Sequence, residues 1–587
     1  IEKRKALAEE MRSKGILASE LGSAEAVIAK LQDAGSDSFI DAEFFPDESA
    51  LFNDPDSSES APVVFRRAKD FVENGNPCVF DGDIKPGDIK QGALGNCWFL
   101  SSIAALAEFP DELIRPLFVT DKCNDFGVFE VKCFKDGKET RVIVDDYFPC
   151  QPGSGKPCYS KSSGDELWVM LLEKAWAKLH GSYEQIESGT PVNAMMDLTG
   201  AFGQTHNFGE PDVGQDIQSG ALYDKLRSYD EKKCLMCAGT PGNDELSKGD
   251  RDKLSGGIVP GHAYTLKAVK EAMSNRLVQL RNPWGRFEWD GDWGDKSELW
   301  TDEMKEAIQP GLKAEEDGQF WMAASDFFTN YSDVNIVHAR GHTGALWKHS
   351  RKSFTTVSGE DVCSQVFEID IPAGATGHLG LCQKDERIRG APSYSRFSFA
   401  LFGPFDDNGI PAKEVLRSNS WSCRQLTQEL PPKDLPEGME PGKYLAVIYN
   451  MGKAEVPVTF VTLLDADGLE AAVVEQREFT PELRQGMLLS TLINSPSASR
   501  DDYEIFEVAR SFLPDRGYAV AARNKLSANL SVKFNFGGCT GLVLDGSDGM
   551  EVEVELEPSE TFQMVAVFKA VADRVGFGMG LSYGVPC

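Results

Sequence analysis

The sequence Gln91-Gly-Ala-Leu-Gly-Asn-Cys-Trp-Phe-Leu-Ser-Ser-Ile-Ala-Ala-Leu106 carries the cysteine around which we expect the fold to be organised. A glycine-rich run leads to Cys97, and the apolar residues after it have helical spacing, which predicts a helix with one buried face. Cys97 would lie in the first turn, where unpaired N–H groups and the helix dipole favour a negative charge. A thiol in that place has its pKa lowered from about 8.5, and the thiolate is the nucleophile. Because a cysteine that opens a helix is more often a small buried hydrophobic residue, its partners further along the chain decide its role.

Length, charge and cysteine content narrow the class of protein. The chain has 587 residues, which is too many for one hydrophobic core, so we expect about three to five domains. Its formal net charge is −32 at pH 7. Such a charge repels nucleic acid and phosphate-rich membrane surfaces, so we expect no nucleic-acid partner, and it attracts divalent cations. Thirteen cysteines without a regular spacing are typical of a reduced, cytoplasmic protein rather than of a disulfide framework.

The remaining patterns predict an α+β protein with several domains. Residues 1–35 have the spacing of charged helices, and a second long helix is expected over 165–180. Alternating residues on both sides of Asp136-Gly137 predict a β-hairpin over 126–147. From about residue 335 onward, short alternating strands separated by Gly, Pro and Asp turns are typical of antiparallel β-sandwiches. The sequence contains no apolar run of about 18 residues that would span a membrane.

His262 is the histidine that we expect to serve Cys97 as a base, because it follows Gly261 and opens an apolar strand. A single histidine on a strand is more often a satisfied core residue, but Asn282 lies at a strand end twenty residues further on. Its amide oxygen would accept a hydrogen bond from the imidazole, and Trp284 would cover that bond and exclude water. The order Cys, His, Asn along the chain is that of papain-like proteases.

Three separated blocks of the sequence resemble the protease core of the calpain family. They are Gln91-Gly-Ala-Leu-Gly-Asn-Cys-Trp98, Gly261-His-Ala-Tyr264 and Arg281-Asn-Pro-Trp-Gly285. The resemblance extends over about residues 40–330, where it includes Glu166-Leu-Trp, Leu172-Glu-Lys-Ala-Trp-Ala-Lys and Glu316-Asp-Gly-Gln-Phe-Trp-Met.

The resemblance implies a catalytic role for each of the motif residues. Cys97 would be the nucleophile, His262 the general base and later acid, and Asn282 the residue that orients the imidazole. The side chain of Gln91 would donate to the oxyanion together with the backbone N–H of Cys97, and each such donor is worth about 10²–10³ in rate. The two further site residues that the resemblance implies are Trp284, which would shield the His–Asn pair, and Gly261, which would contact the substrate.

One other class of enzyme and one departure from the family pattern need to be considered. A transglutaminase also combines Cys with His, but its third member is an Asp, so Asn282-Pro-Trp argues against that class. Asn96 stands before the cysteine where the family commonly has an acid. That position is non-catalytic in the family, so we expect the replacement to be tolerated.

The resemblance also implies a papain-like, two-lobed protease core followed by antiparallel β-sandwich domains. Asp465-Ala-Asp-Gly468 begins like an EF-hand loop, but the twelfth position is Gln476 rather than Glu. We therefore expect an atypical form without the EF-hand domain, and no EF-hand small subunit as a partner. The expected domains are an N-terminal helical segment (1–35), the nucleophile lobe (36–201), the His/Asn lobe (202–333), a calpain-type, C2-like β-sandwich (334–475) and a second β-sandwich-like domain (476–587).

Calpain-like cores carry two calcium ions, one in each lobe, and Ca²⁺ takes roughly six to eight oxygen ligands. Charged residues without a motif usually form a solvated surface, but the acids of this chain fall on the family's ligand positions. Calcium would draw the two lobes together, so that Cys97 would meet His262 and Asn282. The implied ligands of the first lobe are the side chains of Asp88 and Glu166 with the carbonyls of Asp81 and Asp83; those of the second lobe are the side chains of Glu288, Asp295 and Asp317 with the carbonyls of Glu315 and Gln319.

These expectations together predict a calcium-dependent cysteine endopeptidase that performs limited proteolysis of intracellular proteins through a Cys–His–Asn triad. The alternative is a calpain-like scaffold or calcium-responsive interaction protein with little or no proteolytic activity. A third hypothesis is an enzyme with an intact active site that is inhibited by an interdomain contact or by the lack of an upstream segment. Protein substrates are the expected partners, and the β-sandwich domains could add a regulatory protein, membrane or cytoskeletal contact.

Overall fold

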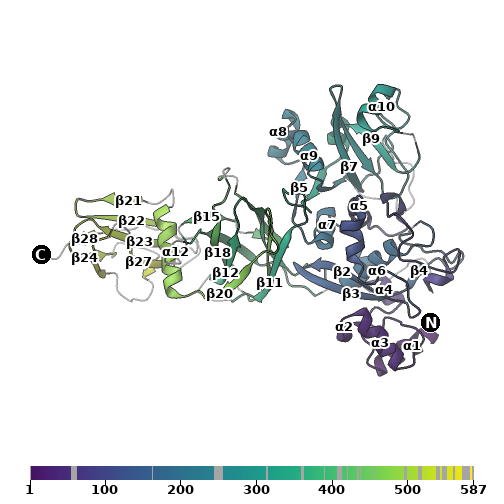
Figure 1. Cartoon of the computed structure of the whole chain (residues 1–587), viewed down its shortest axis with the longest axis horizontal. Coiled ribbons are helices and arrows are strands. Elements are labelled where there is room, and N and C mark those ends of the chain that lie inside the picture. The colour runs from purple at the N-terminus through teal and green to yellow at the C-terminus, as the bar shows by residue number, and fades with distance from the viewer. Residues whose placement is uncertain are drawn as a thin grey trace. The chain divides into compact units, whose positions relative to one another are not determined.

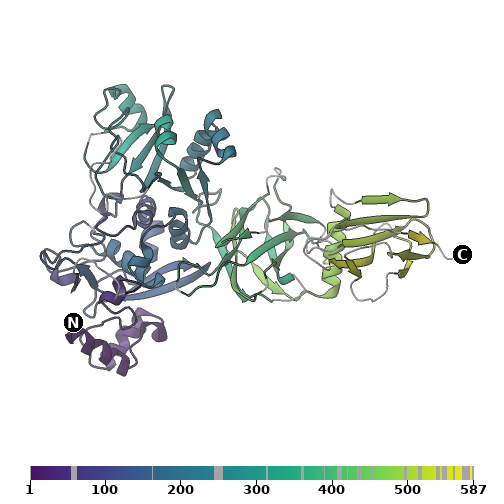
Figure 2. The same ribbon diagram turned by 180° about the vertical axis from the view of Figure 1, so that it is seen from behind.

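The computed structural model separates into two compact units, which Figures 1 and 2 show from opposite sides. The first unit is Ile1–Trp347 together with Lys384–Pro392, and the second is Lys348–Gln383 together with Ser393–Cys587. The structure describes all residues except 1, 55–62, 162, 243–255, 313–314, 358–362, 389, 406–410, 412, 419–420, 433–434, 436–437, 453, 495–498, 513–517, 537–541, 545–550, 560–561, 571–581 and 585–587.

Three helices open the first unit (Figure 1): α1 (Glu2–Ser13), α2 (Ala18–Leu21) and α3 (Ala24–Asp33). Ser23 caps α3, since its hydroxyl accepts a hydrogen bond from the backbone N–H of Ala26 at 3.2 Å. Apolar residues of these helices share a core with Val128 and Ile143 of the β2–β3 hairpin. The hairpin strands are β2 (Val128–Lys135) and β3 (Lys138–Asp145), and the predicted Asp136-Gly137 turn joins them.

Helix α5 (Cys97–Leu106) belongs to the helical part of this unit, which we define as residues 2–201. All ten residues of α5 are buried. On one side Phe99 stacks on Trp176 of α6 with ring centroids 5.0 Å apart, and on another Thr265 Oγ1 donates to the carbonyl of Ser101 at 2.8 Å. The predicted single buried face was therefore wrong, because α5 packs both within the helical part and against the sheet that follows. Further elements of the helical part are α4 (Glu48–Leu51), β1 (Val64–Arg67), β4 (Tyr147–Cys150), α6 (Trp168–His180) and α7 (Pro191–Thr199).

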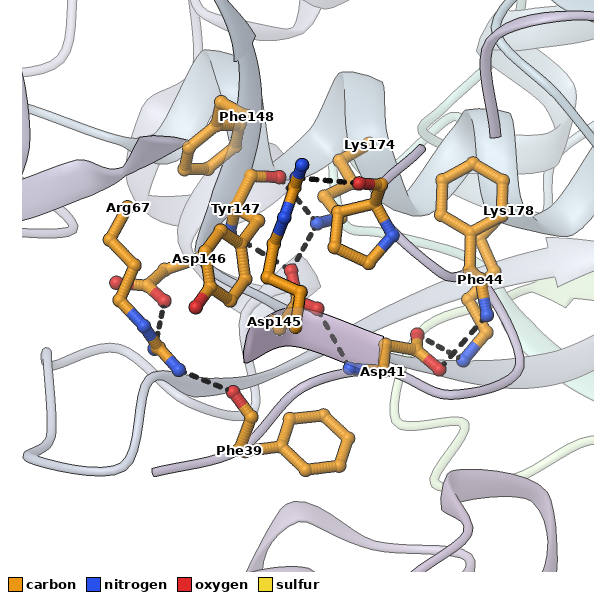
Figure 3. Close-up of polar contacts among 12 residues, drawn as sticks. Phe39, Asp41, Phe44, Arg67, Asp145, Asp146, Tyr147, Phe148, Lys174 and Lys178 are labelled. Carbon is orange, nitrogen blue, oxygen red and sulfur yellow. Dashed lines mark hydrogen bonds and ion pairs between the residues drawn. The ribbon is translucent and has the colours of Figure 1, made fainter. Parts of the chain in front are cut away.

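A buried network of charged side chains attaches residues 39–46 to strand β3 and helix α6 (Figure 3). Lys178 Nζ contacts Asp41 Oδ2 at 2.6 Å, and the backbone N–H of Asp41 donates to Asp145 Oδ2 at 2.7 Å. Lys174 pairs with the other oxygen of Asp145, and Arg67 pairs with Asp146. Breaking one partner of such a buried pair costs about 3–5 kcal/mol, so these pairs fix the path of the chain before β1.

The sheet part of the first unit, which we define as residues 202–338, contains one antiparallel six-stranded sheet in the order β5-β10-β6-β7-β8-β9. Thr265 of β7 pairs with Arg281 of β8, so the residues just before β7 and just after β8 lie beside each other. The strands are β5 (Gly203–Asn207), β6 (Leu235–Gly239), β7 (Ala263–Ala272), β8 (Asn275–Arg281), β9 (Gln319–Ala323) and β10 (Asp333–Val337); the helices are α8 (Pro211–Ser219), α9 (Ala221–Glu231), α10 (Asp302–Ile308) and α11 (Ala324–Asn330).

The second unit begins with two antiparallel sheets that share one hydrophobic cluster. One sheet has the order β11-β19-β13-β17 and the other β15-β14-β18-β12-β20, with β16 beside β14. Phe367 of the second sheet stacks on Phe460 of the first, with ring centroids 5.1 Å apart. The strands are β11 (Lys348–Thr355), β12 (Cys363–Ile371), β13 (Thr376–Gln383), β14 (Arg396–Phe402), β15 (Glu414–Arg417), β16 (Trp421–Ser422), β17 (Gln425–Leu430), β18 (Gly442–Asn450), β19 (Pro457–Asp465) and β20 (Val474–Arg477).

Helix α12 (Pro481–Asn494) leads to two further antiparallel sheets, β21-β22-β23-β27-β25 and β26-β24-β28. Val508 and Phe568 of the first and Val532 of the second belong to one hydrophobic cluster. The strands are β21 (Ser499–Asp502), β22 (Phe506–Phe512), β23 (Tyr518–Asn524), β24 (Leu530–Asn535), β25 (Leu542–Leu544), β26 (Glu551–Leu556), β27 (Gln563–Ala570) and β28 (Ser582–Gly584).

The predicted α+β class with several antiparallel sheets is confirmed. Gln476, the twelfth position of the segment that begins like an EF-hand loop, lies on β20 and pairs with Phe367 of β12. Among the helices of the described residues, none is long and apolar enough to cross a membrane.

Candidate active site

Cys97 is the first residue of α5, and Asn96 occupies the N-cap position before it. The cysteine is 8% exposed. The next residue, Trp98, is held in place because its indole N–H donates to the carbonyl of Ile186 at 2.9 Å. A thiol in the first turn of a helix lies where the helix dipole stabilises its ionised form.

The side chains of His262 and Asn282 lie in hydrogen-bond contact, with 2.9 Å between His262 Nε2 and Asn282 Oδ1. Because an amide oxygen can only accept, Nε2 carries the proton, and a neutral ring has its lone pair on Nδ1. Asn282 is fixed in turn. Its Oδ1 also accepts from the backbone N–H of Trp284 at 3.0 Å, and its Nδ2 donates to the carbonyl of Phe287 at 3.3 Å. The amide therefore sets the orientation of the imidazole.

The indole of Trp284 lies against the ring of His262, with centroids 4.7 Å apart. Trp284 Nε1 donates to Gln91 Oε1 at 2.9 Å, and Gln91 Nε2 donates to the carbonyl of Leu94 at 2.7 Å. The backbone N–H of Gln91 also donates to the carbonyl of Pro283 at 3.2 Å. These contacts bring Gln91, a predicted site residue that belongs to the helical part, next to the His262–Asn282 pair of the sheet part.

Cys97 and His262 line the same cavity, which has a volume of about 710 Å³. This volume is within the range typical of ligand-binding clefts. Gly261, the predicted substrate contact, has a φ of 60°, a left-handed conformation that glycine adopts without steric cost. The other residues of the lining are Ala93, Gly95, Trp98, Glu187, Ser188, Gly189, Thr190 and Pro191 from the helical part, and Thr205, Asn207, Gly239, Thr240, Gly242, Ala263 and Asp333 from the sheet part.

Polar contacts that no motif predicted also join the helical part to the sheet part. Lys267 Nζ of the sheet part lies 3.0 Å from Glu108 Oε1 of the helical part. Arg281 donates from a terminal nitrogen to the carbonyl of Ile89 at 2.9 Å, and burial lowers the pKa of its guanidinium to about 10. These contacts link the part of the chain that carries Cys97 to the part that carries His262.

Glu173 of α6 is a buried acid directly behind the cysteine. Asn96 Nδ2 donates to Glu173 Oε1 at 2.7 Å, and the backbone N–H of Ser160 lies 3.1 Å from Glu173 Oε2. Burial raises the pKa of Glu173 to about 7, and the two hydrogen bonds oppose that rise. The amide of Asn96, at the position where a family acid was expected, is thus a neutral partner for this carboxyl.

The acids predicted for the first metal site lie around Glu166. The backbone N–H of Asp81 donates to Glu166 Oε1 at 2.7 Å, and Trp168 Nε1 lies 3.1 Å from Glu166 Oε2. Burial raises the pKa of Glu166, and the neighbouring charges of Asp88 and Asp81 add to that rise. Asp83 lies in the same exposed loop as Asp81. The structure therefore brings Asp81, Asp88 and Glu166 near one another.

The acids predicted for the second site also gather. Burial raises the pKa values of Glu288 and Asp295, and the charge of Asp317 raises both further. Glu288 Oε1 accepts from the backbone N–H of Gly318 at 2.7 Å, and Asp295 Oδ2 accepts from that of Glu315 at 3.0 Å. A cavity of about 260 Å³ is lined by Asp295, Glu315, Asp317 and Gln319 among others.

These acidic groups do not form a closed metal cage. Among the residues that the structure describes, no three His, Cys, Asp or Glu side chains converge closely enough to hold a metal. In the second group the carboxylates of Glu288, Asp295 and Asp317 repel one another, and backbone N–H groups donate to the first two of them.

A thiol that opens a helix and an imidazole held by an amide, lining one cavity, are the groups that one class of protein, the cysteine peptidases, uses. A family model described as "Calpain family cysteine protease" matches residues 39–338, which is about half of the sequence. The chain belongs to this family.

Curated relatives from plants and animals support the assignment. The chain is 38% identical over 330 residues to the calpain-type cysteine protease ADL1 of Oryza sativa subsp. japonica, a match that covers 55% of this chain and 15% of the relative. It is 38% identical over 320 residues to the calpain-type cysteine protease DEK1 of Arabidopsis thaliana, covering 53% of this chain and 14% of the relative. It is 33% identical over 317 residues to calpain-8 of Mus musculus, covering 51% of this chain and 42% of the relative. The chain therefore spans less than half of the length of each of these relatives.

Proposed function

We propose that the chain is a calcium-dependent cysteine endopeptidase that cleaves intracellular proteins in a limited fashion. The main support for this proposal is the 2.9 Å contact between His262 Nε2 and Asn282 Oδ1. His262 and Cys97 both line the same cavity. An imidazole held in one tautomer by an amide is what a cysteine nucleophile requires of its base.

In the proposed reaction Cys97 and His262 exchange one proton. His262 Nδ1 takes the thiol proton, and the thiolate attacks the peptide carbonyl carbon to form a tetrahedral intermediate. His262 then gives the proton to the leaving amine as the C–N bond breaks, which leaves a thioester on Cys97. A water molecule, activated by the same imidazole, hydrolyses the thioester and restores the thiol.

The oxyanion would be stabilised by the backbone N–H of Cys97 and the amide of Gln91. An amide nitrogen carries two hydrogens, and one of those on Gln91 is directed to the carbonyl of Leu94. The second would serve the oxyanion, with the plane of the amide fixed by Trp284 through Gln91 Oε1. Trp284 would also exclude water from the His–Asn hydrogen bond.

We further propose that the first unit has the papain-like, two-lobed architecture and that the second unit contains two β-sandwiches. The cavity between the helical and sheet parts supports the first proposal, and the hydrophobic clusters shared by pairs of sheets support the second. Protein substrates are the proposed partners, and the second unit is the proposed place for further contacts.

Calcium would be held by one group of oxygens in each half of the first unit. Asp88 and Glu166 with the carbonyls of Asp81 and Asp83 would hold one ion. A bound cation would offset the mutual repulsion of the acids and favour the arrangement in which both parts contribute to the cleft. The proposed ligands of the second ion are Glu288, Asp295 and Asp317 with the carbonyls of Glu315 and Gln319.

The test uses the full chain and casein, with millimolar calcium or with a chelator. We expect cleavage by the unmodified protein in calcium, at least a hundredfold less with the chelator, and none by Cys97→Ala under either condition. Cys123→Ala is the matched control, because Cys123 lies outside the cavity and burial raises the pKa of its thiol to about 12. Absence of cleavage by the unmodified protein in calcium, or equal cleavage by Cys97→Ala, would contradict the proposal.

A further inference from the structure

The cleft that Cys97 lines has acidic side chains in its lining and a basic side chain outside one of its ends. Two acids line it, Glu187 from the helical part and Asp333 from the sheet part, whereas no Lys or Arg is among the described residues of its lining. Arg387 lies outside the lining at the end where Trp98 and Gly189 are found, with its guanidinium carbon 4.9 Å from the centre of the Trp98 ring. The end of the cleft at Asp333 therefore presents a carboxylate to whatever binds there.

The carboxylate of Asp333 is held in one orientation. Ser332 Oγ donates to Asp333 Oδ2 at 2.8 Å, and Asn335 Nδ2 donates to Asp333 Oδ1 at 2.7 Å. Asn335 is fully buried, and its own amide oxygen accepts from Thr205 Oγ1 at 2.9 Å. An ionised carboxylate has about four lone-pair positions, so each oxygen can still accept a further donor.

Gly239 explains how the carboxylate reaches the cleft. A Cβ atom at Gly239 would lie 2.6 Å from Asp333 Oδ2, so any side chain there would occupy the place of the carboxylate. Both residues line the cavity. The absence of a side chain at position 239 thus leaves the acid directly over the β6 backbone.

The strand register places Asp333 at a useful distance from the catalytic histidine. Asp333 pairs with Gly239, and Gly239 pairs with Ala263, the residue after His262. Two strand spacings of about 4.8 Å separate them, roughly 10 Å in all. One or two residues of extended substrate, about 3.4 Å each, followed by a long side chain would cover that span.

We propose that Asp333 is a specificity-determining residue that selects peptide segments with a Lys or Arg side chain within two residues of the cleaved bond, on its acyl side. We place the basic side chain on the acyl side of the bond for the following reason. Asp333 lies on the same wall of the cleft as Gly261, the predicted substrate contact, whereas Gln91 and Trp284 lie on the other side of His262, toward β8. The inference rests on the proposed peptidase function. A charge-assisted hydrogen bond to a fixed carboxylate is among the stronger polar contacts in proteins, so we expect a clear preference.

The test compares peptidyl coumarin amides in saturating calcium, because their leaving group reports acyl-side residues alone. Each of the two positions before the bond carries Lys, norleucine or Glu in turn. At one of them we expect a kcat/KM for Lys at least tenfold above that for norleucine, which corresponds to about 1.4 kcal/mol, and a Lys/norleucine ratio near one in Asp333→Asn. The ratio should also fall as salt is raised in the unmodified protein, and Asp333→Lys should favour Glu.

Two variants serve as controls. Glu231→Gln makes the same charge change on the exposed end of α9 and should keep both the activity and the ratio. Glu187→Gln changes an exposed acid of the same cleft and should alter the ratio less than twofold. A ratio near one in the unmodified protein, a ratio that survives in Asp333→Asn, or one that is lost in Glu187→Gln instead would overturn the assignment. Failure to cleave any peptide of the series, the Lys peptides included, would contradict the proposed function, so the two failures are distinguishable.

Discussion

Glu173 shows, at the scale of single residues, how burial next to the Cys97 helix changes the pKa of a carboxyl group. Its carboxyl is buried behind Cys97 and receives hydrogen bonds from Asn96 and the backbone of Ser160. The protonated form is favoured in the folded protein, because burial raises the pKa of this group from 4.5 to about 7. Below pH 4.5 the folded and unfolded chains both carry the proton, and between the two pKa values the folded chain alone retains it. The stability that this provides is therefore lost as the pH rises toward 7.

We expect Glu173→Gln to reduce the fall in stability between pH 5 and pH 8 by roughly 3 kcal/mol relative to the unmodified protein, since Gln cannot ionise. The measurement is urea unfolding of both proteins at a series of pH values, followed by tryptophan fluorescence. Glu231→Gln, on an exposed part of α9, should keep the pH dependence of the unmodified protein. An equal pH dependence in Glu173→Gln would rule out the raised pKa.

The residues of the candidate site differ in how well the sequence could predict them. Cys97, His262 and Asn282 belong to short motifs with chemical meaning, so the sequence alone could predict them as candidates. Asp333 and Lys267 belong to no motif. Their importance depends on pairing between strands and on contacts between distant segments, which no local pattern encodes.

At the scale of elements, helix α5 and the strand β7 are the pair on which the site depends. Helix α5 carries Cys97 and packs against β6 and β7, and His262 immediately precedes β7. The helix and the hairpin were predictable, because periodicity and turn residues are local signals. The burial of α5 on all sides was not, because the sheet that covers it comes more than a hundred residues later in the chain.

The ion pair between Lys267 and Glu108 is expected to help keep these elements in register. The side chains are 16% and 33% exposed, so the pair lies between the surface and buried cases, and we expect Lys267→Met to cost about 1–2 kcal/mol of stability. A small displacement of His262 relative to Cys97 should also lower kcat, by about tenfold. Thermal unfolding and peptide hydrolysis measure the two effects.

Lys225→Met is the control, because Lys225 pairs with Asp216 on the surface of the sheet part alone. The exchange Lys267→Glu with Glu108→Lys should recover part of the loss, as a double-mutant cycle requires of a direct interaction. If Lys267→Met and Lys225→Met have the same small effect, the pair does not position the two parts.

At the scale of the whole molecule, the family match covers residues 39–338 of the first unit, and the second unit lies entirely outside it. The model match ends at residue 338, close to the point where alternating strands begin to dominate the sequence. The antiparallel sheets after that point could be predicted from alternation and turn residues. Their function could not, since their residues are those of ordinary sheet cores and carry no chemical motif.

The central claim is that one cysteine of the thirteen is an activated thiol and that His262 activates it. Burial raises the pKa of other thiols in the chain to about 12, among them those of Cys133, Cys150 and Cys237. These thiols are protonated at pH 6, whereas a thiolate stabilised by an adjacent imidazolium is still present.

The most direct test is the rate at which iodoacetamide modifies each cysteine of the full chain at pH 6 in calcium, followed by peptide mass spectrometry. We predict that Cys97 reacts at least tenfold faster than every other cysteine, and that His262→Ala reduces its rate to that of an ordinary thiol. Modification of Cys97 at the rate of the other cysteines, or an unchanged rate in His262→Ala, would contradict the account.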